Sequence, residues 1–169
     1  MRNLQTKRIA LGGMLAALAV VIMCLVGLIP VATFVCPVLC MMLCAVVLQL
    51  CGRKIAWAWY GAVSILSLLL APDKEGALVL CFLGYYPIVK PILERYRLKW
   101  VYKVLLFNAA IWILYGITIR IFGMEQVLEE FSQMGTALTV TTLLLGNLTF
   151  FLTDRVLNIV LNKLKIAHY

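Results

Sequence analysis

The segment LLLAPDKEGALVLCFLGYYPIVKPILERYRLKW, residues 68–100, decides how this chain is organised. Its charged turn, PDKEG, stands between two apolar runs, and a group of basic residues follows the second run. A membrane-spanning helix needs about 20 mainly apolar residues. Residues 76–95 reach that length if Lys90 extends its long side chain to the interface and pairs with Glu94 one turn later. The segment therefore predicts a span that begins at an external turn and ends at a cytoplasmic loop.

The composition of the whole chain supports this interpretation. Of the 169 residues, 64% are hydrophobic and 13% are charged, whereas soluble domains contain about 45–50% apolar and about 25% charged residues. We therefore expect a membrane protein in contact with lipid. At this length the chain forms a single transmembrane domain, with no room for a separate soluble domain.

Uncharged runs along the sequence predict an all-α, polytopic bundle of six transmembrane helices. The expected spans are residues 9–29, 34–51, 55–71, 76–95, 101–121 and 132–153, with a cytoplasmic amphipathic tail at 154–169. The chain at Pro30 forms either a short linker or a partly re-entrant segment. Pro87 and Pro91 are expected to kink the fourth span, which neighbouring helices in a bundle can tolerate.

The distribution of charge predicts the orientation of these spans, because lysine and arginine collect on the cytoplasmic side of membrane proteins. With the N-terminus inside, every basic residue except Lys74 and Arg120 falls on the inner side, and every acidic residue except Glu94 and Asp154 falls outside. We therefore predict that both termini are cytoplasmic and that the protein lies in the plasma (inner) membrane. The net charge of +8 is an orientation signal, so we expect no nucleic-acid binding.

The sequence carries no recognisable catalytic or metal-binding motif. Its single histidine, His168, lies next to the C-terminus, so a histidine base is not available. No P-loop motif is present, so we do not expect the chain itself to hydrolyse ATP. Cys36, Cys40 and Cys44 share one helix face, but no C-x-x-C pair or histidine completes a tetrahedral site. We predict no metal and no cofactor, and we interpret the cysteines as packing residues.

One group of charges at the cytoplasmic end allows a different interpretation. A membrane enzyme that acts on lipid would need an acid/base pair close to one interface. Only Asp154 and Arg155, with Lys90 and Glu94, resemble such a pair. Ion pairing and anchoring explain these residues more simply, so we predict that the protein is not an enzyme.

The fifth and sixth spans carry polar residues at positions where lipid would make them costly. Asn108, Trp112, Tyr115 and Arg120 lie on one face of the fifth helix, and the sixth helix presents a threonine-rich face flanked by Asn147. An amide beside two aromatic rings suits a planar, polar ligand, and an arginine suits a carboxylate or a phosphate. We predict that these residues bind a ligand. Hydrogen bonding between helices explains the threonines equally well.

The first span contains two overlapping pairs of small residues. Gly12 with Ala16, and Gly13 with Ala17, each have the spacing that lets another helix approach closely. Two interpretations remain open, namely packing inside this chain and contact with a helix of a partner protein.

A basic N-terminus leads into this Ala/Gly-rich helix, KRIALGGMLAALAVV at residues 7–21. Together with six spans, internal termini and external loops at 30–35, 72–75 and 120–130, it resembles the substrate-binding S components of energy-coupling factor (ECF) transporters. The resemblance covers nearly the whole chain in layout. In that family the small residues pack on the coupling subunit. Here glycine replaces one alanine, which leaves the register open between the two pairs.

The resemblance implies a capture subunit that binds a vitamin or related micronutrient in a cavity open to the outside. Asn108, Trp112, Tyr115 and Asn147 would lie deep in that cavity, and Arg120 near its mouth. A transmembrane coupling subunit and two ABC-type ATPases would supply the energy. The main alternative is a non-catalytic membrane scaffold of the cell envelope, which would need no ligand.

Overall fold

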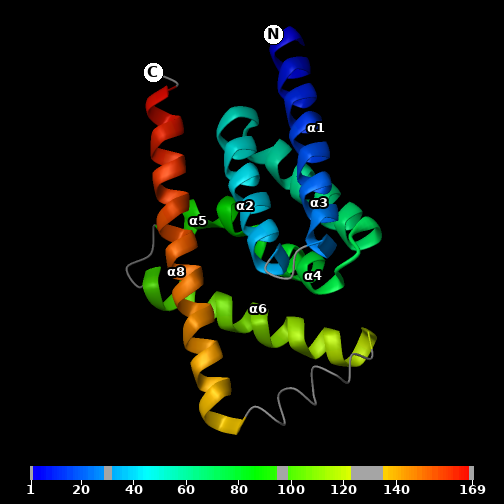
Figure 1. Cartoon of the computed structure of the whole chain (residues 1–169). Helices are drawn as coiled ribbons and strands as arrows, with labels where there is room; N and C mark the ends of the chain where they lie inside the picture. Colours follow the sequence, from blue (N-terminus) through cyan, green and yellow to red (C-terminus); the bar gives the residue numbers. More distant parts are fainter. Residues whose placement is uncertain (1, 29–31, 95–98, 123–134, 168–169) are drawn as a thin grey trace.

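The computed structural model describes residues 2–28, 32–94, 99–122 and 135–167, and every regular element in these ranges is helical (Figure 1). The elements are α1 (Arg2–Cys24), the short 3₁₀ helix η1 (Leu25–Leu28), α2 (Ala32–Cys51), α3 (Arg53–Leu70), α4 (Lys74–Leu83), α5 (Tyr86–Leu93), α6 (Lys99–Phe122) and α8 (Gly135–Ala167). In lipid a backbone must satisfy its own hydrogen bonds, and a helix does so within one segment.

Four helical stretches in the described part of the chain are long and apolar enough to cross a membrane. They are Gln5–Cys24, Thr33–Cys51, Lys74–Leu93 and Leu144–Leu161. A shorter apolar stretch, Trp100–Leu114, lies in α6. The predicted all-α, polytopic fold is thereby confirmed, and the protein is a multi-pass helical membrane protein. In Figure 1 the start of α1 and the end of α8 lie at the same end of the molecule. Which side of the membrane they face stays a prediction.

The fourth predicted span consists of two consecutive helices, α4 and α5. Pro87 lies in the first turn of α5, where a helix does not need the missing N–H group. At the junction, a Cβ atom on Gly84 would clash with the backbone carbonyl oxygen of Leu80 and would lie 3.2 Å from the ring of Tyr60, so the end of α4 and its approach to α3 both favour glycine. The kink expected in this span therefore takes the form of a break between two helices.

The charged turn between α3 and α4 caps both helices. The side chain of Asp73 accepts a hydrogen bond from the backbone N–H of Glu75 at 3.0 Å, which caps the start of α4. Lys74 donates to the carbonyl oxygens of Leu68 and Ala71, both at 3.0 Å, at the end of α3. These local contacts account for two of the three charges in the PDKEG segment.

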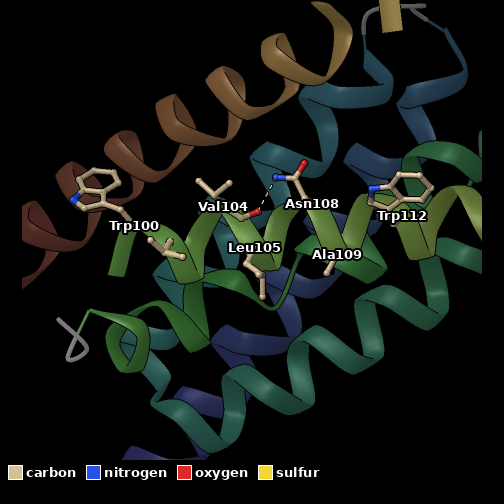
Figure 2. A pocket seen from close by; sticks show the side chains of 7 residues that line it. Trp100, Val104, Leu105, Asn108, Ala109 and Trp112 are labelled. Carbon is tan, nitrogen blue, oxygen red and sulfur yellow. Dashed lines mark hydrogen bonds between the residues drawn. The ribbon is translucent and has the colours of Figure 1, made fainter. Parts of the chain in front are cut away.

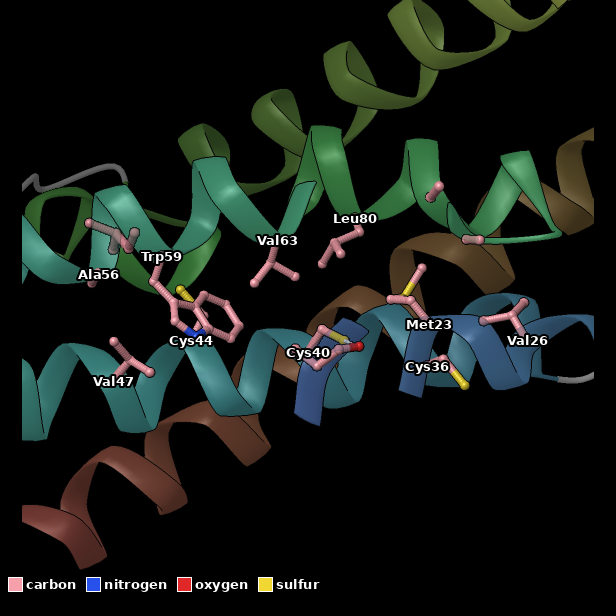
Figure 3. Packing of buried hydrophobic residues seen from close by; sticks show 14 of the residues in the cluster. Met23, Val26, Cys36, Cys40, Cys44, Val47, Ala56, Trp59, Val63 and Leu80 are labelled. Atoms are coloured by element: carbon pink, nitrogen blue, oxygen red, sulfur yellow. Dashed lines mark hydrogen bonds between the residues drawn. The ribbon is translucent and has the colours of Figure 1, made fainter. Parts of the chain in front are cut away.

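The first hydrophobic core lies among α1, α2, α3 and α4 (Figure 3). Cys40 and Cys44 are fully buried in it, and Cys44 lies beside the ring of Trp59 of α3. The thiol of Cys40 donates to the carbonyl oxygen of Ala19 at 3.6 Å, which joins α2 to α1. All six cysteines are free thiols. The cysteine stripe thus takes part in helix packing, as cysteine commonly does.

The second hydrophobic core joins α2, α4, α5, α6 and α8. At its centre Phe150 of α8 stacks on Phe107 of α6, with the ring centroids 4.8 Å apart, and it lies equally close to Tyr86 of α5. Figure 1 shows that α6 passes across the lower part of α8, whereas α1 and α2 run in the same general direction as α8. The crossing brings α6 and α8 together around these aromatic rings.

Candidate functional site

Two of the predicted ligand-binding residues meet where α6 crosses α8. The amide nitrogen of Asn108 donates to the side-chain oxygen of Asn147 at 3.1 Å and to the carbonyl oxygen of Val104 at 2.8 Å. Asn147 donates in return to the side-chain oxygen of Asn108 at 3.5 Å. Paired amides satisfy each other among apolar neighbours, and such pairs hold helices together in membranes. The arrangement therefore offers a polar contact point within an apolar interface.

A groove of about 640 Å³ follows one face of α6 beside this amide pair (Figure 2). We call it the α6 groove, and its lining residues are Trp100, Val101, Val104, Leu105, Asn108, Ala109 and Trp112. Asn108 is its only hydrogen-bonding side chain apart from the two indole rings, which stand at its opposite ends. Trp112 is 76% exposed. The α6 groove is thus an open, apolar surface with one amide near its middle.

The structure brings together some of the predicted site residues and leaves others undescribed. Asn108, Trp112 and Asn147 lie along or beside the α6 groove. Tyr115 and Arg120 belong to α6, but their side chains lie outside the described residues. Their part in a ligand site stays a prediction.

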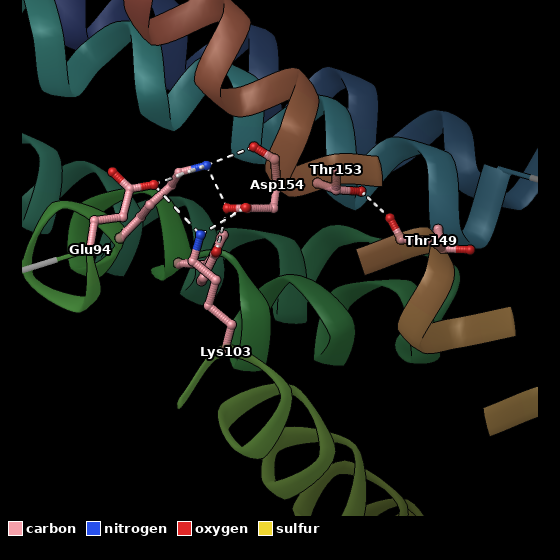
Figure 4. A network of polar contacts seen from close by, with 7 residues as sticks. Glu94, Lys103, Thr149, Thr153 and Asp154 are labelled. Carbon is pink, nitrogen blue, oxygen red and sulfur yellow. Dashed lines mark hydrogen bonds and ion pairs between the residues drawn. The ribbon is translucent and has the colours of Figure 1, made fainter. Parts of the chain in front are cut away.

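A cluster of charged residues that the sequence only partly indicated lies deeper in the fold (Figure 4). We call it the Asp154 cluster, and it consists of Tyr86, Lys90, Glu94, Lys103 and Asp154. One carboxylate oxygen of Asp154, Oδ1, accepts hydrogen bonds from Lys90 and from the hydroxyl of Tyr86. The other, Oδ2, accepts one from Lys103 at 2.8 Å. Lys90 also donates to the backbone carbonyl of Asp154 at 2.7 Å.

Burial makes this cluster unusual for charged groups. Lys90 is fully buried, and Asp154 and Lys103 are 3% and 5% exposed. The side chain of Glu94 is 39% exposed and lies 3.5 Å from Lys103 and 3.9 Å from Lys90. Two ammonium groups thus face two carboxylates. Such balance is what makes burial of charge tolerable, because an unpaired ion in an apolar interior is strongly destabilising.

The expectation that Lys90 extends to the membrane interface is wrong. Its ammonium group bonds to Asp154 inside the protein, since a carboxylate and a carbonyl oxygen lie within reach there. The expected pairing of Lys90 with Glu94 is confirmed, although at 3.9 Å it is the longest contact of the cluster. Ion pairing between Asp154 and Lys90 is confirmed as well.

Sequence reasoning missed two members of the cluster, Tyr86 and Lys103. Lys103 falls within the expected span 101–121 and was counted only as an inner-side charge, and the structure shows it buried and bonded to Asp154. A signal was present in the sequence, because Lys103, Phe107, Ala110 and Leu114 lie on one face of a helix. All four side chains are buried. A lysine on the same helix face as a row of apolar residues is expected to point toward the protein interior.

The two small-residue pairs of α1 point in different directions. Gly12 is buried, and a Cβ atom there would lie 3.4 Å from the Ile55 side chain of α3. Gly13 is exposed, with nothing within 4 Å of such an atom, and Ala17 is exposed as well. The pair of Gly12 and Ala16 therefore packs inside the chain, and the pair of Gly13 and Ala17 faces outward.

Comparison with family models, with curated proteins and with solved structures finds no match for this chain. Its class is therefore established only as a multi-pass helical membrane protein. The features that bear on its function are the outward face of α1, the α6 groove and the Asp154 cluster.

Proposed function

We propose that the protein is the substrate-capture membrane subunit of an ECF-type importer in the plasma (inner) membrane. The observation that carries this proposal is the outward pair of Gly13 and Ala17 on α1. The inward pair already serves the packing of α1 against α3, so packing within the chain does not account for the second pair. Small residues on an exposed helix face allow a helix of another protein to approach closely. A transmembrane coupling subunit is the partner that we assign to this face.

The ligand in this proposal is a vitamin or a related micronutrient that reaches the α6 groove from outside. Asn108 and Asn147 are suited to exchange their mutual hydrogen bonds for bonds to a polar group of the ligand. Trp112 offers an exposed ring on which a planar group can stack. Tyr115 and Arg120 would extend this surface further along α6. The chain has no P-loop sequence, so two ABC-type ATPases would supply the energy.

A pull-down from the native host in mild detergent tests this proposal. The tagged protein would be purified, its partners identified, and any bound small molecule extracted and identified by mass spectrometry. Recovery of a membrane coupling protein, two ATPases and a small molecule supports the importer. Gly13→Phe should abolish recovery of the partners, because the ring blocks close approach. Met14→Phe, on the neighbouring exposed position, is the matched control and should retain them.

A membrane scaffold is the second candidate, and one observation favours it. Asn108 and Asn147 already satisfy each other, so their presence does not require a ligand. A scaffold predicts that the pull-down recovers cell-envelope proteins and no small molecule. It also predicts that Trp112→Ala leaves every partner in place.

A further inference from the structure

The Asp154 cluster joins three helices, α5, α6 and α8. Asp154 of α8 receives more hydrogen bonds from α5 than from α6. From α5, Lys90 bonds to both Oδ1 and the backbone carbonyl of Asp154, and Tyr86 bonds to Oδ1. From α6, only Lys103 reaches the carboxylate, with a single bond to Oδ2. If Lys103 moved away, Asp154 would keep one ammonium partner and one hydroxyl partner. Its negative charge would remain balanced.

Lys103 also has a second carboxylate within reach. Its second carboxylate neighbour, Glu94, lies 3.5 Å away and is the most exposed member of the cluster. A lysine carries its charge on a long flexible stem and can extend it toward water while the stem stays in apolar surroundings. Lys90 lies 3.9 Å from the same Glu94 carboxylate, but it is fully buried and holds the backbone carbonyl of Asp154 as well as its carboxylate, so it is the more firmly held of the two lysines.

Lys103 lies close in sequence to the other residues through which α6 contacts α8. Within the next five residues of the chain lie Phe107, stacked on Phe150, and Asn108, bonded to Asn147. Trp100, three residues before Lys103, also stacks on Phe151 of α8 with the ring centroids 5.2 Å apart, so the ion pair lies among the aromatic and amide contacts that join α6 to α8. The lysine is therefore placed to fix how the α6 groove lies relative to Asn147.

We propose that Lys103 is the positioning residue of α6 and that it docks this helix on α8 by a releasable ion pair. When Lys103 leaves Asp154, α6 is held to α8 only by aromatic and amide contacts, while Lys90 and Tyr86 keep α5 and α8 joined. In the bound position the pair holds Asn108 against Asn147. The consequence for ligand binding rests on the proposed function, whereas the docking of α6 does not.

Cross-linking of α6 to α8 in the full-length protein tests the proposal. Asn108→Cys and Asn147→Cys together place two thiols at the crossing. A short methanethiosulfonate cross-linker would be added to the protein in its native membrane, and the linked peptide would be quantified by mass spectrometry. With Lys103 in place we expect rapid cross-linking. Lys103→Met should slow it about fivefold, the effect expected from losing one coupled pair.

Two controls separate positioning from general stability. Lys103→Arg keeps the charge and should restore the cross-linking rate. Glu94→Gln alters only the exposed edge of the cluster and should leave the rate within about twofold of the original. Thermal unfolding would be measured in parallel, where Lys90→Met should lower the melting temperature more than Lys103→Met does.

The proposal is overturned if Lys103→Met leaves the cross-linking rate unchanged, or if the variant fails to fold. An unchanged rate would show that Lys103 does not position α6, and failure to fold would show that the lysine serves the stability of the whole fold. An equal loss with Lys103→Arg would also overturn it, since the charge would then not be the cause. The measurement needs no ligand and no partner, so its failure leaves the importer proposal standing, and an importer proposal that fails leaves this one standing.

Discussion

The ammonium nitrogen of Lys103 lies 2.8 Å from Oδ2 of Asp154, although 51 residues separate the two along the chain. Both side chains are buried. Neither charge would be stable there without a partner of opposite sign, because an apolar interior does not solvate ions. The position of α6 on α8 therefore depends on charge pairing as well as on the contact between aromatic rings.

Neutralising Asp154 should be among the most damaging single changes in this protein. Asp154→Asn keeps the size of the side chain but leaves Lys90 and Lys103 buried without their shared carboxylate. Breaking a buried pair in this way costs about 3–5 kcal/mol. Thermal unfolding in detergent, followed by circular dichroism, would measure the loss. A variant as stable as the original protein would show that the lysines find other partners.

Glu94→Gln supplies the matched comparison, because it removes a carboxylate from the same cluster. Glu94 is partly exposed, and its contacts with the lysines are 3.5 and 3.9 Å long. Ion pairs at exposed positions contribute about 0–1 kcal/mol. We expect its melting temperature to stay close to that of the original protein. A decrease in melting temperature as large as that of Asp154→Asn would show that Glu94 contributes as much as Asp154 to the stability of the cluster.

Phe150 and Phe151 are neighbours in sequence and should differ in their contribution to stability. Phe150 is 7% exposed and packs against two aromatic rings in the second core, whereas Phe151 is 37% exposed. Phe150→Ala should cost about 3–5 kcal/mol, the usual effect of emptying a buried aromatic site. Phe151→Ala should cost much less. Unfolding of both variants under identical conditions gives the comparison, and equal losses would contradict the difference in burial between the two rings.

The sequence was sufficient for the parts of this fold that depend on local pattern. The apolar runs indicated the helices, and the spacing of four residues between Lys90 and Glu94 indicated their contact. The burial of Lys103 was not predicted, because the positive-inside rule concerns the side of the membrane and not the partners of a charge. Its true partner, Asp154, lies on a helix much later in the chain, and no short-range pattern records that pairing.

The candidate site was predictable to the same limited extent. Polar residues within apolar spans pointed to Asn108 and Asn147, and their side chains do meet. The crossing of α6 over α8 was not predictable, since hydropathy records how apolar a helix is and not the direction in which it packs. For the same reason the sequence could not distinguish the inward Gly12 from the outward Gly13.

Gly12 and Gly13 should respond differently to the same substitution. A leucine at Gly12 would press on Ile55, which already lies 3.4 Å from the position of a Cβ atom. Overpacking of this kind costs about 1–3 kcal/mol. A leucine at Gly13 enters open space and should leave the melting temperature unchanged. If Gly13→Leu were the more destabilising of the two, the assignment of the inner and outer faces of α1 would be wrong.

Trp112 should matter for binding and not for folding. Its ring is 76% exposed, so Trp112→Ala removes little packing and should leave the melting temperature unchanged. If the protein captures a planar ligand, the variant should yield less of the small molecule that co-purifies with the original protein. Ile113→Ala, also on the exposed surface of α6, is the matched control. Equal ligand recovery from both variants would argue against a role for the indole.

The shared carboxylate of Asp154 also bears on how the protein is made. Chains are synthesised from the N-terminus, so Lys90 and Lys103 enter the membrane before Asp154 has been translated. Until α8 arrives, both lysines lack the carboxylate that later holds them. Insertion of the last helix therefore completes the charge balance of the two preceding ones, because before residue 154 is made the two lysines share a single carboxylate, Glu94.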